Sequence, residues 1–537
     1  MLTVYVGAAA RTFHHGTAHH LPRAVLVRDG RVEGFADPDR RDTRADWGGA
    51  RVHDLGGAVL APGFFDAHNH QPSAARDRGQ VRTAHVTGLD GLRAALAAAA
   101  RERRPGEWIS TEHPLTLSQL DPPELPTAAD LDPVTPHHPT AVRFGAHTMV
   151  LNTRALRLSG LAALPADPPG GVLDRDPHTG APLGPVREYG ALRYVLAHLT
   201  GPDDLPAALR ATQHEYARAG ITALRVTGFR PGDRELYEAL LAADGRLAHR
   251  VAGGPRLDPT TPLAERLAAV DAWDPAGPHS EWLRPDAVKI FVDGGVETAL
   301  DGTTHLFTGP GDLLTLVRHA VARGWSVACH AVTADAVGLA LDAYESVGGP
   351  APGRRFAVEH GFLATPAQLA RAARLGVWLS AQPAVAHIES ALVHARLPDP
   401  TGAFPLASAL AGGVRCALGS DWNATPGTRL RPFDPLASVR AAVTRAGADG
   451  RSLGADEAVD TATALYLHTR APALLAGLDD VGGLWPGARA DLVALGADPV
   501  EDLGAARVVG VVTGGEPLPD TPGERSAPPL HAPPHAP

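Results

Sequence analysis

The chain has 537 residues, of which 44% are apolar and 20% are charged, and its formal charge is -10. This composition is typical of a globular protein with a large core, and no apolar run approaches the roughly 20 residues of a membrane-spanning helix. The acidic balance disfavours a broad phosphate-binding surface, so nucleic acid is not an expected partner, and two cysteines exclude a disulfide scaffold.

Both ends of the chain predict strands. The first ten residues are apolar, but no Lys or Arg precedes them, so they make a poor signal peptide and a cytoplasmic location is expected. Four terminal segments alternate between apolar and polar residues as strands do, namely 2–6, 24–34, 490–495 and 507–518. They predict a small β-sandwich domain built from residues 1–57 and 484–518. The seven prolines of 519–537 predict a disordered tail.

Between these ends, a helix that ends in Gly is repeatedly followed by a short, apolar, β-branched strand. Four copies of this pattern cover 217–226, 321–330, 372–382 and 409–421, and four further strands fit at 58–68, 250–257, 287–293 and 355–361. Eight buried strands that alternate with helices predict an α/β fold, a (β/α)8 TIM-like barrel over residues 58–483. An open doubly wound sheet is disfavoured because no Gly-rich phosphate loop follows the first strand.

A large insertion separates the first two predicted barrel strands. Residues 72–215 lie there, far more than the roughly 2 to 6 residues of an ordinary βα loop. They include an Ala-rich helix at about 91–104 and several Pro-rich irregular stretches. We expect this insertion to form a cap on the substrate side of the barrel.

Residues that can bind a metal stand at the ends of five predicted strands. They are His68, His70, Lys289, His330, His360 and Asp421. Barrel enzymes build their active sites at the carboxyl ends of the strands, so these side chains should meet at one rim. Alternation along a strand places His68 and His70 on the same side, where both imidazoles can reach one cation. Nitrogen and oxygen ligands favour zinc, with Mn, Fe or Ni left open.

Lys289 is the only lysine among 49 basic residues. Unlike arginine, lysine can lose its proton and react as an amine. A neutral Lys289 that reacts with carbon dioxide becomes a carbamate, a carboxylate-like group that can bridge two cations. Two cations would make a bridging water acidic enough to attack as hydroxide near neutral pH. This interpretation predicts two divalent metal ions, zinc first, together with carbon dioxide as the source of the carbamate.

Several segments carry a family pattern. They include PGFFDAHNH at 62–70, VKIFVDGG at 288–295, HAVTADAV at 330–337, RRFAVEHGFL at 354–363, LGSDWN at 418–423 and VGGLWPGARADLVAL at 481–495. The chain resembles the amidohydrolase superfamily and, within it, the N-substituted formamide deformylase-like branch, metal-dependent amidohydrolase family 3. The resemblance implies that the metal ligands are His68, His70, Lys289, His330 and His360 and that the catalytic aspartate is Asp421.

The same branch supplies candidates for substrate binding. The stretch FGAHTMVLNTRAL at 144–156 looks like a further signature, and two rim loops carry polar or aromatic residues. The candidate substrate-binding residues are His147, Asn152, Glu188, Gln382 and Trp422. After the fourth strand, residues 293–304 depart from the usual family pattern, which leaves the identity of the substrate open.

The sequence therefore predicts a metal-dependent hydrolase that cleaves a carbon–nitrogen bond of a small amide, formamide or cyclic amide. Asp421 would take the proton of the attacking hydroxide and hand it to the departing amine. Two alternatives stay open: a mononuclear deaminase of the same superfamily, in which Lys289 is not carboxylated, and a non-catalytic relative that binds a ligand. Barrels of this kind are commonly dimers, so a homodimer also stays open.

Overall fold

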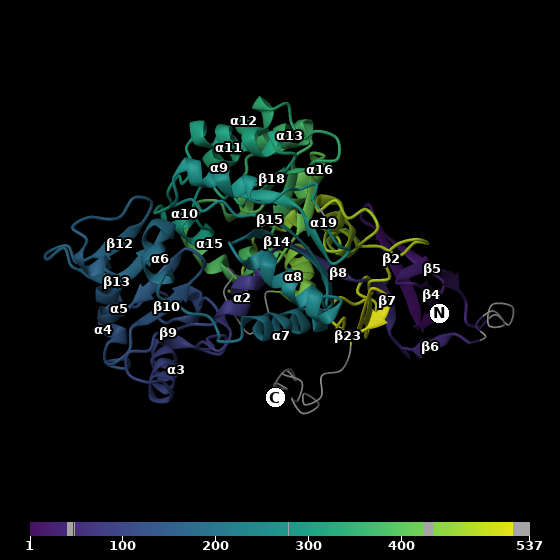
Figure 1. Ribbon diagram of the computed structural model, residues 1–537, viewed down its shortest axis with the longest axis horizontal. Coiled ribbons are helices and arrows are strands. Elements are labelled where there is room, and N and C mark those ends of the chain that lie inside the picture. Colours follow the sequence, from purple (N-terminus) through teal and green to yellow (C-terminus); the bar gives the residue numbers. More distant parts are fainter. Residues whose placement is uncertain (40–46, 48, 278, 424–432, 519–537) are drawn as a thin grey trace.

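The computed structural model describes residues 1–39, 47, 49–277, 279–423 and 433–518. The predicted tail, 519–537, lies outside them. Helices surround a central group of strands, and two smaller regions lie at opposite ends of the long axis (Figure 1). Within the described ranges, no helix is long and apolar enough to cross a membrane.

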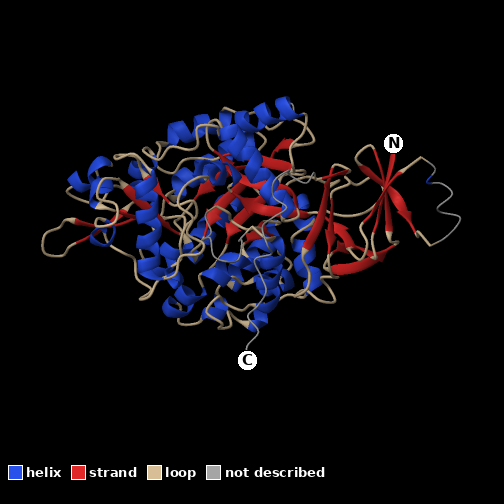
Figure 2. Ribbon diagram, turned by 90° about the horizontal axis from the view of Figure 1, so that it is seen from below, coloured by secondary structure: helices blue, strands red, loops and turns tan. Residues whose placement is uncertain are grey.

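Strands from both termini form two sheets at one end of the molecule (Figure 2). These strands are β1 (Leu2–Val6), β2 (Ala9–His14), β3 (Thr17–Leu21), β4 (Ala24–Arg28), β5 (Arg31–Ala36), β6 (Arg51–Asp54), β7 (Val59–Pro62), β22 (Leu492–Leu495), β23 (Val508–Thr513) and β24 (Glu516–Pro517). The strand orders are β5-β4-β1-β6 and β24-β23-β22-β7-β2-β3. Apolar side chains of both sheets, among them Tyr5, Leu60 and Leu492, share one cluster. Segments from opposite ends of the sequence thus build a single core.

The segment 58–68, expected to form one strand, divides at Gly63. Its first half, β7, pairs with β2 and β22, whereas its second half, β8 (Phe64–Asn69), pairs with β14 (Ile221–Phe229). A Cβ at Gly63 would lie 2.1 Å from Thr222 Oγ1, so only glycine allows the chain to pass from one sheet to the other here. The expectation that the whole segment is a central strand is wrong for β7.

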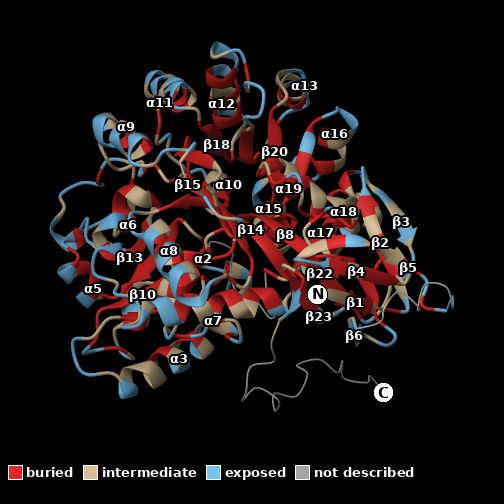
Figure 3. Cartoon of the chain, turned by 45° about the vertical axis from the view of Figure 1, so that its right-hand side comes forward, coloured by how far each residue is buried: buried red, intermediate tan, exposed pale blue. Residues whose placement is uncertain are grey.

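The central strands are parallel and almost entirely buried (Figure 3). Besides β8 and β14 they are β15 (Arg250–Pro255), β16 (Leu283–Pro285), β17 (Ala287–Phe291), β18 (Ser326–Ala331), β19 (Phe356–His360), β20 (Trp378–Ala381) and β21 (Arg415–Leu418). Their ladders form two sheets, ordered β16-β15-β14-β8 and β17-β18-β19-β20-β21. Single bridges join the sheets at both edges, between Asn69 and Trp422 and between Arg256 and Lys289. The fold is mixed α/β, and the ladder hydrogen bonds of the described residues do not form one continuous barrel.

Helices connect successive central strands and cover their outer side (Figure 2). They are α7 (Leu205–Arg218), α8 (Asp233–Asp244), α9 (Leu263–Asp271), α10 (Val296–Asp301), α11 (Pro310–Ala322), α12 (Ala334–Ser346), α13 (Pro366–Leu375), α14 (Pro383–Ile388), α15 (Ser390–Arg396) and α16 (Leu406–Ala411), followed by α17 (Pro435–Thr444), α18 (Thr461–Leu467) and α19 (Arg470–Leu475). The glycines expected at helix ends act as stop signals. Gly376, for example, ends α13 in the left-handed conformation, with φ of 69°.

The insertion after β8 forms a separate region at the end opposite the terminal sheets (Figure 1). Its strands, in the order β12-β13-β11-β10-β9, are β9 (Ile109–Ser110), β10 (Thr140–Phe144), β11 (Thr148–Leu151), β12 (Val172–Arg175) and β13 (Pro182–Arg187). Its helices are α2 (Gln71–Asp77), α3 (Gly88–Glu102), α4 (Ala128–Leu131), α5 (Thr153–Leu158) and α6 (Glu188–Leu196). Two apolar clusters of its own give this cap region a core.

Candidate metal centre

The carboxyl ends of the central strands bring the expected ligands to one place. Lys289, His330 and His360 stand on the adjacent strands β17, β18 and β19, whose ladders pair Phe291 with His330 and Ala331 with His360. His68 lies near the end of β8, and Asp421, three residues after the end of β21, donates its N–H to the His68 carbonyl oxygen over 2.8 Å. Parallel strands that end at a common edge thus collect residues from distant parts of the sequence.

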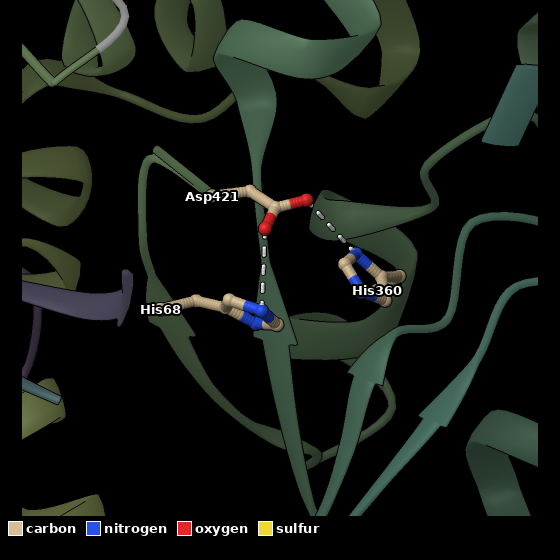
Figure 4. A group of neighbouring side chains, drawn as sticks. All are labelled: His68, His360 and Asp421. Atoms are coloured by element: carbon tan, nitrogen blue, oxygen red, sulfur yellow. Dashed lines mark ion pairs between the residues drawn. The ribbon is translucent and has the colours of Figure 1, made fainter. Parts of the chain in front are cut away.

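Asp421 is the centre of this group. Its Oδ1 lies 3.0 Å from His70 Nε2 and 3.4 Å from His68 Nε2, and its Oδ2 lies 4.0 Å from His360 Nδ1. Donor atoms of His68, His360 and Asp421 all lie within 4.8 Å of one another (Figure 4). This spacing would allow the three side chains to hold one cation.

The remaining expected ligands adjoin the same cluster. The His330 ring lies 4.4 Å from the His360 ring, centroid to centroid, and the His68 ring lies 4.8 Å from the latter. The side chain of Lys289 is 1% exposed, and among the described residues its Nζ has no hydrogen-bond partner, as is also true of His68 Nε2. Buried polar atoms normally have a hydrogen-bond or ligand partner. The described protein atoms do not provide one for this amine or for this imidazole nitrogen.

Burial sets the protonation of these groups. It lowers the pKa of His70 to about 4 and that of Lys289 to about 8, and it holds the pKa values of His330 and His360 well below the usual range. Burial would raise the pKa of Asp421, but coulombic interactions with His68, His70 and Lys289 and a hydrogen bond with His70 outweigh it and lower that pKa. Near neutral pH the site therefore offers the neutral imidazoles of His70, His330 and His360 and the carboxylate of Asp421, which are metal-ligand forms.

A hydrogen-bond network holds Asp421 in a strained backbone conformation. Asp421 and His360 have φ values of 54° and 75°, in the left-handed region that residues with a side chain seldom adopt. Just before Asp421, Ser420 donates its N–H and its hydroxyl to the buried carboxylate of Asp66, over 2.9 and 2.6 Å. Asp66 also accepts from the His68 N–H, so one carboxylate fixes both strand ends.

A second buried carboxylate, Glu359, orients His68. Its Oε2 lies 2.7 Å from His68 Nδ1, and its Oε1 accepts from Arg225 Nη1 over 3.0 Å. Burial would raise the pKa of Glu359, but Arg225 and His68 outweigh it and hold that pKa well below its usual range. As a carboxylate, Glu359 accepts the Nδ1–H of His68 and leaves the Nε2 lone pair free for a cation.

Two candidate substrate residues of the cap region reach the centre. His147, in the turn between β10 and β11, lies with its ring 5.7 Å from that of His330, and its Nδ1 is 2.6 Å from Glu188 Oε2. Burial would lower the pKa of His147, but the adjacent Glu188 carboxylate raises it to about 10. His147 therefore carries a positive charge beside the strand ends.

The other three candidate substrate-binding residues differ in how close they lie to the expected metal ligands. Gln382 lies between two expected ligands, with Oε1 2.8 Å from His360 Nδ1 and Nε2 3.3 Å from His68 Nδ1. Asn152 is not brought to the site: it caps α5 by accepting the Ala155 N–H and is 1% exposed in the cap core. Trp422 is 3% exposed, and its ring packs against the rings of His113 and Phe433. Trp422 therefore has a packing role beside the site.

Two cavities meet at this centre. The smaller is lined by residues that include His147, His330, His360 and Asp421, and the larger begins at His70 and extends along the cap region. Ala146 lines both, so the turn that carries His147 lies between them. A small molecule in either cavity would lie beside expected ligands.

A family model described as the amidohydrolase family matches residues 51–519. The chain belongs to the amidohydrolase family. It is 30% identical over 516 residues to N-substituted formamide deformylase of Arthrobacter pascens, covering 89% of this chain and 91% of that protein. It is 27% identical over 504 residues to the putative amidohydrolase YtcJ of Bacillus subtilis, with coverage of 89% and 91%. An uncharacterized metal-dependent hydrolase from Pyrococcus horikoshii shares the fold, with a TM-score of 0.71, 21% identity and coverage of 93% and 98%.

The expected family is thus confirmed, and this amidohydrolase is a hydrolase that acts on carbon–nitrogen bonds. Its residues also fit a divalent cation. The donor set of imidazoles and a carboxylate suits a divalent ion, and the buried Nε2 of His68 would gain the partner that the described protein atoms do not provide.

Two residues of the amidohydrolase site, Glu359 and Arg225, are not among those expected from the sequence. A charged residue inside the apolar strand 356–360 was the available signal, since a buried carboxylate needs a partner. The partners themselves, His68 and Arg225, lie 291 and 134 residues away in the chain. Only the fold reveals that Glu359 orients an expected metal ligand.

Replacing Glu359 with glutamine should weaken the affinity of the amidohydrolase for its divalent cation by about 10- to 100-fold. The amide keeps the shape of the side chain but carries no charge to hold the Nδ1–H of His68. Competition with a chelator of known affinity would measure the change.

Glu457→Gln is the matched control, because Glu457 is also a buried carboxylate and accepts the Ser408 N–H over 2.9 Å. It should leave the metal affinity unchanged. Equal affinities for the Glu359→Gln variant and the unaltered enzyme would contradict the orienting role.

Proposed function

We propose that this amidohydrolase is a metal-dependent hydrolase of a small amide, formamide or cyclic amide. The observation that carries the proposal is the buried group of His68, His360 and Asp421, whose donor atoms lie within 4.8 Å of one another at the edge of a cavity. The similarity of this chain, over most of its length, to N-substituted formamide deformylase supports a carbon–nitrogen bond of this kind as the target.

The proposed architecture is a (β/α)8 TIM-like barrel over residues 58–483. The single bridges at both edges of the two central sheets support closure of the eight strand positions into one barrel. Residues 1–57 and 484–518 would form the β-sandwich domain, with β7 added to it, and residues 72–215 the cap. The homodimer and the cytoplasmic location stay predictions.

The proposed site holds two divalent cations, zinc first. His68 and His70 would hold one, His330 and His360 the other, and Lys289 would lie between them as a carbamate. In forming the carbamate, the neutral Nζ bonds to the carbon of carbon dioxide and loses one proton to solvent. Divalent cations in such a site polarise the scissile carbonyl and make water more acidic.

Asp421 would move the proton. Its carboxylate is the form that accepts a proton from the attacking water, and the same carboxyl group then donates that proton to the amine nitrogen as the carbon–nitrogen bond breaks. An amine is a poor leaving group unless its nitrogen receives this proton. Charged His147, which lines the same cavity, would stabilise the negative charge that develops on the carbonyl oxygen.

A mononuclear deaminase is the second candidate. One observation favours it: within the described ranges, the metal-binding group of His, Asp or Glu side chains found near the strand ends contains His68, His360 and Asp421, enough for one cation. In that case Lys289 stays an amine and Asp421 both binds the ion and transfers the proton.

Metal analysis of the purified protein, prepared with bicarbonate and without chelator, separates these functions. We expect about two zinc-like ions per chain, as a carbamate-bridged site requires. About one ion per chain would favour the mononuclear deaminase. A chain that holds no ion and takes up none on titration would contradict both enzymes and support the ligand-binding relative.

A further inference from the structure

The larger cavity beside the metal centre combines an apolar wall with several charges. The apolar side chains include Met149, Tyr189, Leu192, Leu196 and Phe291. The charged side chains are Arg76, Arg143, Arg230 and Arg256, with Asp77 and Asp233. His70 lies at the end that meets the metal centre, so a molecule bound at the reacting atoms would extend past these groups.

Two of the four arginines that line this cavity are paired with a carboxylate. Arg76 and Arg143 each form an ion pair with one of the two aspartates. Among the described residues, Arg230 and Arg256 have no ion-pair partner, and both are partly exposed and line the cavity. The cavity therefore has an excess of two positive charges, which is costly beside apolar walls unless a ligand balances it.

The two arginines follow neighbouring strands, and two aromatic rings lie beside Arg256. Arg230 follows β14 and Arg256 follows the neighbouring β15, where it bridges to Lys289. The Arg256 guanidinium carbon lies 5.0 Å from the ring centroids of Tyr189 and Phe291. Burial and then the charge of Arg256 lower the pKa of Arg230 to about 10, so the two charges act on each other. An anion between them would relieve this repulsion.

We propose that Arg230 and Arg256 bind an oxyanion of the substrate. The proposal rests on the proposed cleavage of a carbon–nitrogen bond and names the substrate class: an N-formyl or N-acyl amine with an apolar body and a carboxylate or phosphonate group. Planar guanidinium groups bind such oxyanions through paired hydrogen bonds. An uncharged formamide would leave both guanidinium groups without a partner, which disfavours it.

Three substrates that differ only at the anionic group test this subsite: N-formylphenylalanine, its phosphonate analogue and N-formyl-2-phenylethylamine. The better of the two anionic compounds should have a kcat/KM about 10- to 100-fold above that of the uncharged one. Arg256→Gln and Arg230→Gln should lower kcat/KM for the anionic compounds, mainly through KM, so that the ratio of anionic to uncharged kcat/KM falls toward one. Arg256→Lys should restore part of it.

Arg210→Gln is the control, because Arg210 is exposed on α7 and pairs with Asp244. It should change none of the three rates. A higher rate for the carboxylate or for the phosphonate compound identifies the oxyanion. Equal kcat/KM values for charged and uncharged compounds would overturn the subsite while leaving formamide hydrolysis intact.

Binding of 3-phenylpropionate, followed by calorimetry, keeps the two proposals separable if none of the three compounds is hydrolysed. Binding that weakens at least tenfold in Arg256→Gln would support the subsite and count against the proposed function. Binding that is absent, or the same in the unaltered enzyme and in Arg256→Gln, would overturn the subsite as well.

Discussion

Replacing Lys289 with arginine should lower the metal content from about two ions to one or none per chain and reduce kcat by at least about 10³-fold, while the chain still folds. Arginine keeps the positive charge but cannot become a neutral amine and cannot form a carbamate. The buried strand β17 would then present a permanent cation to His330, His360 and Asp421, which repels a metal ion. Metal analysis and circular dichroism of the same sample measure both effects.

Two further measurements separate the carbamate from a purely structural lysine. In Lys289→Ala, a short carboxylate such as acetate or propionate should restore part of the metal content and rate, because it can occupy the vacated space. Since the chain has one lysine, a carbamate signal from ¹³C-labelled bicarbonate that disappears in Lys289→Ala would belong to this side chain. Two retained metals and an unchanged rate in Lys289→Arg would refute the carbamate role.

The sequence was sufficient to predict the central strands because a buried parallel strand between helices has a strong signal. Apolar and β-branched residues dominate these strands, and before four of them a glycine marks the end of the preceding helix, as Gly376 does. The polar residues at the strand ends stood out against this background. Apolar runs do not reveal which sheet a strand joins, however, and β7 was therefore assigned to the wrong one.

Residues of the inserted cap region were harder to place. His147 and Glu188 do approach the strand ends, whereas Asn152 caps a helix, and polarity alone does not distinguish these roles. Asparagine is a favourable cap because its side-chain oxygen accepts a backbone N–H at the start of a helix. The arginines of the larger cavity raise the same difficulty, since ion pairing neutralises two of them and only the fold shows which.

Replacing Asp421 with asparagine should reduce kcat for an amide substrate by about 10²- to 10⁴-fold, the range that a lost general acid–base group covers. Asparagine retains an oxygen at nearly the same position but cannot accept and return a proton. Steady-state rates and metal content should be measured together, because Asp421 also lies 3.0 Å from His70 Nε2. Asp335→Asn is the control, because Asp335 is exposed in the first turn of α12. This substitution should change neither the rate nor the metal content.

The nature of the leaving group distinguishes proton transfer by Asp421 from a role in metal binding alone. A phenolate leaves without protonation, whereas an amine does not, so Asp421→Asn should slow the hydrolysis of formanilide far more than that of phenyl formate. If Asp421 only binds metal, both substrates should slow by the same factor, in step with the metal that is lost. A selective loss at constant metal content therefore requires that Asp421 delivers the proton to the departing nitrogen.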